Sequence, residues 1–390
     1  MGGATCPQPG MPMDPFALTA AAFAIATTLL HVLTVLIAAA RFSRPAAPAS
    51  IDPQLPAVTI IRPLCGVDAY EDETLRSVFR LDHSDYEVIL CVADSGDPVI
   101  PLARSAMAAH AHVTARLLIG DDRISLNPKL NNVVKGWRAA RHGWIVIVDS
   151  NVLVPRDYLG RLLATWRSDT GLVCAPPIGA LPAGFAAEIE CAFLNTYQAR
   201  WQYAVDTLGH GFAQGKTMLW RREDLDAAGG LAALARDVAE DAAATKVVRA
   251  HRRRVRLVDR PFPQLLGPRT LANVWRRQLR WSRLRRASFP ACYAPEIFTG
   301  LALPLAAAVG AAPALDLPPL GVAAGMIVVW LGAEAGLAAA AGWHLSWRSP
   351  LAWLARDLML PVLWCAALTG SRFEWRGSPM RASATASRQA

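Results

Sequence analysis

Aspartates follow two short apolar runs in the first half of the chain, at positions that suit chemistry on a phosphate-bearing ligand. Asp94 comes shortly after residues 87–92, and Asp149 directly follows residues 144–148. Ligands of open α/β sheets gather at the carboxyl ends of strands, so both aspartates are candidate contacts. Asp149 opens Asp149-Ser150-Asn151, a relaxed Asp-x-Asp pattern. We expect Asp94 to contact a nucleoside and Asp149 to hold Mg²⁺ or Mn²⁺, which prefer oxygen ligands and bridge phosphates. The alternative for both aspartates is an ordinary turn or cap residue.

Two more charged residues stand where they could take part in the same chemistry. Lys129, in Asn127-Pro128-Lys129, either meets phosphate or is the solvated lysine of a helix start. Asp241 follows Glu240 in the alanine-rich stretch of residues 238–248. Such an acidic pair usually marks a solvated helix face. In a desolvated pocket, however, the pKa of Asp241 would rise toward neutrality, which suits a general base that accepts a hydroxyl proton.

A dense basic segment, residues 276–285, ends the polar part of the chain and contains Arg277, Arg280 and Trp281. At 100° per residue its arginines cannot all share one helix face. One subset can therefore face a diphosphate while the others meet anionic headgroups. Tryptophan suits both sugar stacking and the membrane interface. The alternative is a peripheral helix that only adheres to a membrane.

The elements that must position these residues have the pattern of an α/β domain over residues 57–291. Residues 58–61, 87–92 and 144–148 are apolar strand patterns, and residues 71–81 and 102–110 between them have helical spacing. Apolar strands that alternate with helices predict a parallel sheet covered on both faces.

Long apolar segments flank this domain. Residues 16–40 are long enough to span a bilayer, after a short tail of residues 1–15 and before a linker of residues 41–56. Arg41 and Arg44 place the linker end in the cytoplasm by the positive-inside rule. Residues 292–370 contain further membrane segments, at 297–312, 320–341 and, more weakly, 351–368. Arg356 and Asp357 lie in the last segment, so it is re-entrant, interfacial or directed toward the protein interior. Residues 371–390 form a basic tail, which favours a cytoplasmic end.

The composition agrees with a protein partly in lipid. Of the 390 residues, 53% are hydrophobic and 18% charged, below the quarter or so that soluble domains carry. The net charge of +9 suits membrane lipids or phosphate-bearing substrates. No nucleic-acid module is recognisable, so nucleic acid is not an expected partner. The seven cysteines include no C-x-x-C pair, which argues against a disulfide framework or zinc site and favours a reducing compartment.

Taken together and in this order, the motifs from about residue 58 to residue 290 resemble the ceramide glucosyltransferase family, most closely its bacterial branch. That family has three spaced aspartates followed by an (R/Q)-x-x-R-W motif. Segments 62–66, 127–129, 171–173, 215–218 and 239–241 also look like the family. The positions that match the family's motifs are Asp94, Asp149, Asp241, Arg277, Arg280 and Trp281.

The resemblance implies a GT-A type fold and an inverting single displacement. The primary hydroxyl of ceramide would attack the anomeric carbon of UDP-glucose, giving β-glucosylceramide and UDP. Asp241 would be the base and Asp149 would hold the metal on the diphosphate. Arg280 and Trp281 would bind the diphosphate and line the acceptor pocket. The triplet has Asn in place of a second carboxylate, so the identity of the metal stays open. The setting implied is a bacterial inner membrane, with the catalytic domain facing the cytoplasm.

Other functions remain open. The same chemistry can use another UDP-sugar (galactose, glucuronate or N-acetylglucosamine) or another lipid (a hopanoid or diacylglycerol). A processive polysaccharide synthase has a related final motif but usually more membrane spans. A binding protein on a decayed transferase fold would not be expected to keep all three aspartates and the Arg-Trp motif.

Overall fold

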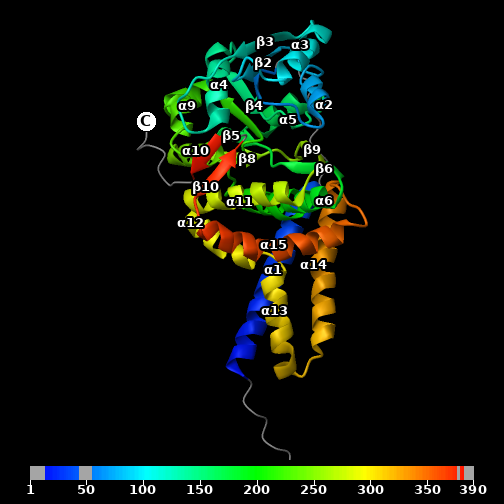
Figure 1. The fold of residues 1–390 in the computed structure, drawn as a ribbon. Helices are drawn as coiled ribbons and strands as arrows, with labels where there is room; N and C mark the ends of the chain where they lie inside the picture. The colour runs from blue at the N-terminus through cyan, green and yellow to red at the C-terminus, as the bar shows by residue number, and fades with distance from the viewer. Residues whose placement is uncertain (1–13, 44–54, 376–377, 382–390) are drawn as a thin grey trace, which may run out of the picture.

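The structure is a computed structural model that describes residues 14–43, 55–375 and 378–381. It has an α/β domain at one end, a layer of helices lying crosswise beneath it, and a bundle of long helices running away from it (Figure 1). The expected tail of residues 1–15, the linker of 41–56 and the basic end of 371–390 fall largely outside the described residues.

A seven-stranded sheet forms the centre of the α/β domain, in the order β3-β2-β1-β4-β7-β5-β8. The three expected strand patterns are present as β1, β2 and β4. The prediction of a wholly parallel sheet is wrong, because β7 runs antiparallel to both of its neighbours, β4 and β5. Apolar runs do not reveal strand direction. The strands are β1 Val58–Leu64, β2 Tyr86–Val92, β3 Thr114–Ile119, β4 Trp144–Val148, β5 Thr170–Cys174, β7 Thr217–Arg221 and β8 Arg254–Leu257.

Helices cover both faces of the sheet, as predicted, because successive side chains of a strand point to opposite faces. Ile60 of β1 packs into the core shared with α2, α3 and α5, whereas Ile61 packs into the core shared with α4, α7 and α10. Asn127 caps α4 by accepting from the amides of Lys129 and Leu130. The domain helices are α2 Glu71–Ser77, α3 Val99–Ala109, α4 Pro128–Ala139, α5 Tyr158–Thr165, α7 Arg200–Thr207, α8 Arg222–Ala227, α9 Gly230–Leu234 and α10 Glu240–Ala250.

A second, two-stranded sheet joins the domain to the helices beneath it. Its strands β6 (Ile178–Ala183) and β9 (Pro263–Pro268) are parallel, and Gln264 of β9 also bridges Val152 beyond β4. After β6 the chain forms one long helix made of α6 (Phe185–Ala192), the π-helix η1 (Phe193–Ala199) and α7. The basic segment forms α11 (Leu271–Ser288), which lies beside α6 (Figure 1).

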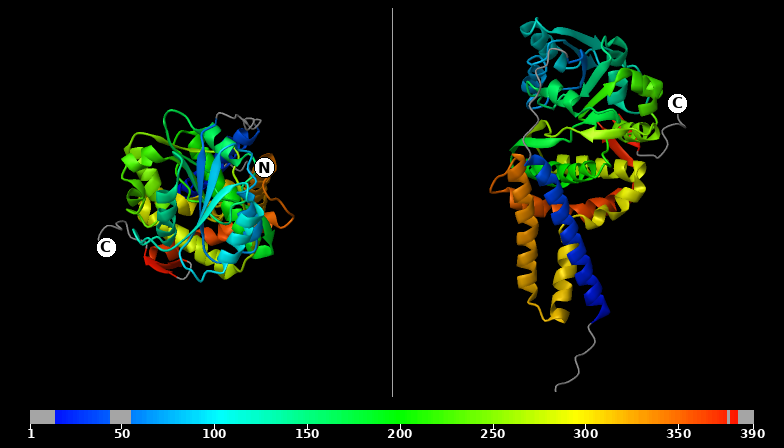
Figure 2. Two further views of the ribbon diagram at one scale, coloured as in Figure 1. Left: turned by 90° about the horizontal axis from the view of Figure 1, so that it is seen from above. Right: turned by 180° about the vertical axis from the view of Figure 1, so that it is seen from behind.

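Three helices form the bundle that runs away from the domain (Figures 1 and 2). They are α1 (Pro15–Phe42), α13 (Ala302–Ala311) and α14 (Pro319–Ala341). By length and composition, α1, α14 and α15 could each cross a membrane, and residues 290–298 with 302–315 form a pair bent by 46°. The short elements around the bundle are α12 Pro290–Tyr293, η2 Ala294–Phe298 and η3 Ala312–Leu315.

The helix α15 (Ser349–Leu368) lies across the top of this bundle, directly beneath α11 (Figure 1). Its Arg356 and Asp357 are buried, and Arg356 pairs with Glu334 of α14 at 2.7 Å. The two charges that interrupt the apolar run therefore point into the protein. Beyond α15, β10 (Arg372–Trp375) pairs antiparallel with β11 (Ser378–Arg381).

Candidate active site

Asp149 stands at the carboxyl end of β4, at the start of a short turn. The Val152 amide donates to the Asp149 carbonyl at 3.2 Å, and the Asp149 amide donates to the Lys216 carbonyl at 3.0 Å. Arg62 of β1, which is fully buried, supports the turn from below. Its guanidinium donates to the carbonyls of Ser150 and Val152. The turn is thus anchored on both neighbouring strands, β1 and β7.

Two lysines contact the carboxylate of Asp149. Lys129 Nζ lies 2.7 Å from Oδ1, and Lys216 Nζ lies 2.7 Å from Oδ2. Lys216 also donates to the side-chain oxygen of Asn151 at 3.0 Å. Lys129 lies in the first turn of α4, two residues after the N-cap Asn127, and Lys216 directly precedes β7. The carboxyl edge of the sheet therefore carries a compact cluster of one carboxylate and two ammonium groups.

The pKa values of the three charged groups in this cluster are shifted in different directions. Burial alone would raise the pKa of Asp149, but the ammonium groups of Lys129 and Lys216 hold it well below its usual range. Burial works against the charge of Lys129 too, but Asp149 and Glu240 raise its pKa. Burial lowers the pKa of Lys216 to about 8, against the pull of Asp149 and with a further lowering by Arg277. Asp149 is consequently a permanent anion at neutral pH.

Asp241 lies in the first turn of α10, next to Glu240. Its Oδ2 accepts from the Gly215 amide at 3.3 Å, and its Oδ1 accepts from the Ala242 amide at 2.8 Å. Burial, followed by the charge of neighbouring Glu240, raises the pKa of Asp241 to about 6. A carboxylate with this pKa is ionised at neutral pH and is a much better proton acceptor than an ordinary aspartate.

Glu240 connects α10 to α4. Its Oε1 lies 2.8 Å from Lys129 Nζ, and its Oε2 accepts from Asn127 Nδ2 at 2.7 Å. Gly215 packs against this pair so closely that a Cβ at position 215 would lie 2.8 Å from Glu240 Oε1. Only glycine fits there without displacing the glutamate. Asp149, Lys129, Glu240 and Asp241 are therefore parts of one connected site.

Residues 277–281 of α11, which match the (R/Q)-x-x-R-W motif, lie near Lys216 of the site. Arg277 forms an ion pair with the buried Glu190 of α6 and donates to Gln264 Oε1 at 3.2 Å. Its guanidinium lies over the ring of Trp281, 4.5 Å from the ring centroid. Trp281 packs against the core of α6, η1 and β9, and Arg280 is partly buried. In this structure the charge of Arg277 is thus neutralised by protein, although it remains close enough to lower the pKa of Lys216.

Asp94 follows β2, which is separated from β4 by β1. Its carboxylate is exposed, and its Oδ1 accepts from the Gly96 amide at 2.9 Å, which closes a turn. Asp94 and Asp149 therefore lie along the same edge of the sheet, but no contact joins them. Of the predicted site residues, Lys129, Asp149 and Asp241 come together; Arg277, Arg280 and Trp281 lie on the adjoining helix, and Asp94 stands apart.

The structure adds residues that the motif analysis did not assign to the site. They are Lys216, Glu240, Asn127, Arg62 and the pair Glu190 and Gln264. A signal existed for Lys216, because it stands in segment 215–218, which looks like the family. Arg62, Asn127 and Glu240 likewise stand in the family-like segments 62–66, 127–129 and 239–241. No comparable signal marks Glu190 or Gln264, whose roles depend on contacts between segments distant in sequence.

The oxygen atoms at the Asp149 turn suit a divalent cation. Asp149 and Asn151 present a carboxylate and an amide oxygen to one point, where the Lys216 ammonium lies within 3.0 Å of both. Mg²⁺ and Mn²⁺ prefer oxygen ligands, so either ion could bind the same two oxygens that the Lys216 ammonium now contacts. Within the described residues, no group of three or more His, Cys, Asp or Glu side chains surrounds a common point. The remaining ligands would come from a bound phosphate and from water.

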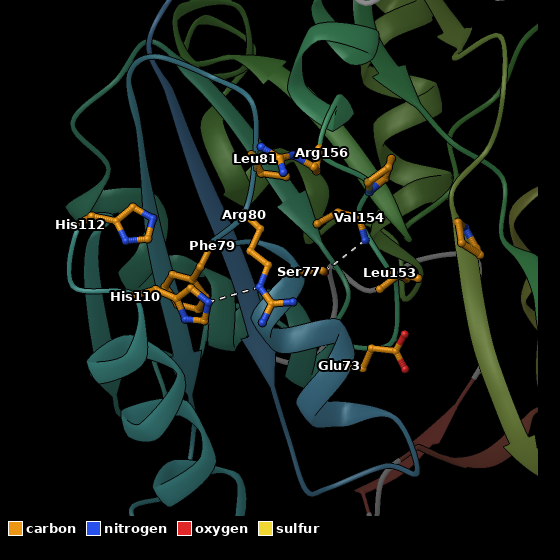
Figure 3. A pocket seen from close by; sticks show the side chains of 12 residues that line it. Glu73, Ser77, Phe79, Arg80, Leu81, His110, His112, Leu153, Val154 and Arg156 are labelled. Atoms are coloured by element: carbon orange, nitrogen blue, oxygen red, sulfur yellow. Dashed lines mark hydrogen bonds between the residues drawn. The ribbon is translucent and has the colours of Figure 1, made fainter.

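An open cavity of about 690 Å³ lies elsewhere, between α2, the end of α3 and the turn of residues 153–156 (Figure 3). Within it, Arg80 Nε donates to His110 Nε2 at 3.4 Å, and the Val154 amide donates to Ser77 Oγ at 3.2 Å. None of the candidate catalytic residues lines this cavity.

Comparison with solved structures identifies the fold. A mannosyltransferase from Pyrobaculum calidifontis, solved with GDP-Man and Mn²⁺, aligns with a TM-score of 0.52. The alignment covers 90% of this chain and 98% of that one, at 20% sequence identity. The GT-A type fold predicted from the sequence is confirmed.

Sequence comparison identifies relatives. Ceramide glucosyltransferase 1 of Caenorhabditis elegans is 26% identical over 276 residues, which are 70% of this chain and 59% of the relative. The ceramide glucosyltransferase of Komagataella phaffii is 32% identical over 201 residues, which are 46% of this chain and 40% of the relative. The chain thus spans less than two thirds of these relatives. The model of glycosyl transferase family 21 matches residues 15–387, nearly the whole sequence, and the chain belongs to that family.

Proposed function

We propose that this protein transfers glucose from UDP-glucose to the primary hydroxyl of ceramide, producing β-glucosylceramide by inversion at the anomeric carbon. The observation that carries the proposal is the placement of a partly buried aspartate, Asp241, beside the cationic cluster around Asp149. One side of the site can accept a proton while the other receives a diphosphate. Glycosyl transfer needs both.

Asp241 is the base in this proposal. Its raised pKa and its position at the start of α10 let it accept the hydroxyl proton of the acceptor as oxygen attacks the sugar. Glu240 and Lys129 hold the neighbouring backbone and Asp149 in place. Arg280 and Trp281 on α11 border the site where the donor diphosphate and acceptor meet. Asp94, exposed along the same sheet edge, is available to the nucleoside.

A divalent cation belongs to this proposal, with Asp149 and Asn151 as its protein ligands. When bound, it would neutralise charge on the leaving diphosphate. The mannosyltransferase that shares this fold was solved with Mn²⁺, which supports a cation of this type. The assay described below compares transfer rates with Mg²⁺ and with Mn²⁺.

A lipid acceptor is supported by the arrangement of the helices. The helix α11, which carries the motif, lies directly on α15, and α15 lies across the apolar bundle (Figure 1). The names of the relatives, all ceramide glucosyltransferases, favour ceramide. We further propose that the domain faces the cytoplasm of a bacterial inner membrane. Arg41, at the domain end of α1, pairs with Asp206 of the domain at 2.5 Å, and basic residues favour the cytoplasmic side.

A product assay tests the proposal. Membranes containing the protein are incubated with ceramide and a panel of UDP-sugars, with Mg²⁺, with Mn²⁺ and with chelator. One new glycolipid, formed from UDP-glucose and missing with Asp241→Asn, is the expected result. Product from another UDP-sugar would change the donor, and product only on a total bacterial lipid extract would change the acceptor. No product under any condition would overturn the proposal.

A further inference from the structure

The two lysines that contact Asp149 differ in how fully their hydrogen bonds are used. An ammonium group has three N–H donors and no acceptor. Lys129 Nζ has three acceptors, at 2.7 Å from Asp149 Oδ1, 2.8 Å from Glu240 Oε1 and 2.5 Å from the Gly215 carbonyl. Its donors are all engaged. Lys129 is therefore a fixed cation between two carboxylates.

Lys216 has fewer partners. Within the described part of the chain its ammonium contacts two acceptors, Asp149 Oδ2 at 2.7 Å and Asn151 Oδ1 at 3.0 Å. One N–H therefore remains for a further acceptor. The backbone of Lys216 is anchored, since its carbonyl accepts from the Asp149 amide at 3.0 Å. The flexible four-carbon stem lets the ammonium move while the strand stays in place.

The surroundings of Lys216 favour an incoming anion. Besides Asp149, the charges that act on it are the cations Arg277 and Lys129. Arg277 approaches from α11 with its own charge already paired to Glu190. Lys129 is shared between Asp149 and Glu240, and Arg277 is paired with Glu190, so Asp149 is the carboxylate that Lys216 contacts. A nucleotide diphosphate supplies an anionic acceptor for the remaining N–H of Lys216.

Lys216 also occupies the position that a divalent cation would share. Its ammonium lies between the oxygens of Asp149 and Asn151, the protein ligands of the proposed cation site. An ammonium and a divalent cation cannot both sit there. Entry of the cation requires Lys216 to leave, and the nearest new partner is the diphosphate that arrives with it.

We propose that Lys216 holds the cation position between Asp149 and Asn151 in the donor-free protein and turns to the donor diphosphate when nucleotide and cation bind. This inference rests on the proposed function, because it takes the ligand to be a nucleotide diphosphate. It assigns Lys216 two effects of opposite sign. Lys216 opposes cation binding when nucleotide is missing, and it strengthens nucleotide binding.

The test compares Lys216→Met with the wild-type protein, both as full-length chains purified in detergent. Binding of Mn²⁺ alone is measured by electron paramagnetic resonance, and binding of UDP with Mn²⁺ by calorimetry. For Lys216→Met we expect tighter binding of Mn²⁺ alone. We expect UDP affinity to fall by roughly 10- to 100-fold, the loss typical of a hydrogen bond between charged groups.

Two further variants keep the test decisive. Lys216→Arg retains the charge and should recover most of the UDP affinity. Lys246→Met removes a lysine paired with Asp237 at 2.9 Å, away from Asp149, and should change neither measurement. A thermal-unfolding curve for each variant identifies any that fail to fold. If Lys216→Met does not fold, Lys216→Gln replaces it in both measurements.

Unchanged UDP affinity in a folded Lys216→Met, or Mn²⁺ binding that stays equal or weakens, would overturn the inference. Failure of the proposed function gives a different result, in which wild-type protein binds no UDP at all. The measurement with Mn²⁺ alone still tests the competition in that case, because it involves no nucleotide.

Discussion

Asp149 and Asp241 are the same residue type, and their neighbours give them opposite properties. Paired lysines keep Asp149 ionised, whereas burial and the adjacent Glu240 raise the pKa of Asp241 to about 6. Sites that need both a fixed negative charge and a proton acceptor commonly separate two carboxyl groups in this way. Lys129, bonded to both Asp149 and Glu240, joins the two environments.

Replacing Asp241 with Asn tests its role as base. The amide keeps the shape of the side chain but cannot accept the proton, so we expect transfer to fall by roughly 10²- to 10⁴-fold. UDP binding should stay within about twofold, since Asp241 has no part in holding the diphosphate. Initial rates of glycolipid formation and calorimetric titration with UDP give the two values. Parallel loss of both would remove Asp241 from the role of base.

The pH dependence of transfer should report the same group. Below pH 6 the carboxyl of Asp241 becomes protonated and can no longer accept the acceptor proton. We expect kcat/KM for the donor to fall about tenfold per pH unit below that point. The profile is measured between pH 4.5 and 8.5 in one buffer series. A rate that stays level from pH 6 down to pH 4.5 would instead indicate an aspartate with an ordinary pKa.

Asp241 should also lower the stability of the protein at neutral pH. Its pKa is higher in the folded protein, about 6, than the roughly 3.9 of an unfolded chain. Its contribution to stability is therefore fully present below about pH 4 and is lost as the pH rises through 6. Asp241→Asn should raise Tm at pH 7.5 but leave it nearly unchanged at pH 4. A drop in Tm at pH 7.5 would contradict this account.

The sequence allowed part of the site to be predicted. Asp149 could be placed because it directly follows an apolar strand, and Asp241 because the motif order resembled a family. The partners of these residues could not be predicted. Lys216 reaches Asp149 because β7 runs antiparallel beside β4, and nothing in residues 217–221 reveals that direction. Glu190 is paired with Arg277 across 87 residues of chain.

At the scale of elements, the π-helix η1 connects the α/β domain to the helices below. Four successive polar side chains reach different elements. Asn195 bonds to Gly179 of β6, Thr196 to Glu334 of α14, Tyr197 to Thr299 beside η2, and Gln198 to Gln278 of α11. A π-helix has a wider turn than an α-helix and often marks a functional region. Here it orients four consecutive residues toward four neighbours.

Asn195→Ala should weaken this connection. Asn195 accepts from the Gly179 amide at 2.7 Å and donates to the Gly179 carbonyl at 3.1 Å, and it is buried. Its loss leaves two backbone groups without partners, which costs about 1–3 kcal/mol each. We expect a clear decrease in Tm in detergent. Thr207→Ala, an exposed position on α7, is the control and should change Tm little. Equal Tm values for the two variants would show that the bonds add no stability.

At the scale of the whole molecule, a buried charge network holds α15 against the bundle. Arg356 contacts Glu334 of α14 at 2.7 Å, Asp357 at 3.0 Å and Thr196 of η1 at 3.0 Å. All four side chains are buried. From the sequence, Arg356 and Asp357 only weakened the case for a membrane span. Their partner Glu334 stands in an apolar run nearly as long as a bilayer is thick, and spacing along the chain cannot reveal that pairing.

Removing one member of the network should destabilise the folded protein. Glu334→Leu leaves Arg356 with a single carboxylate partner in an apolar setting, and breaking a buried pair costs about 3–5 kcal/mol. We expect a lower Tm and faster proteolysis between α14 and α15 in detergent. Arg348→Gln removes an exposed charge at the start of α15 and is the control. If both variants unfold alike, the network does not stabilise the contact between these helices.

The crosswise position of α15 has a consequence for kinetics. For the lipid acceptor proposed above, the position of α11 on α15 and of α15 over the bundle favours arrival by lateral diffusion within one leaflet (Figure 1). The quantity that sets the rate would then be the mole fraction of acceptor among the surrounding lipids rather than its amount per volume. Inert phospholipid added at constant acceptor and protein would slow turnover by surface dilution, whereas a larger volume of buffer with the donor concentration unchanged would not.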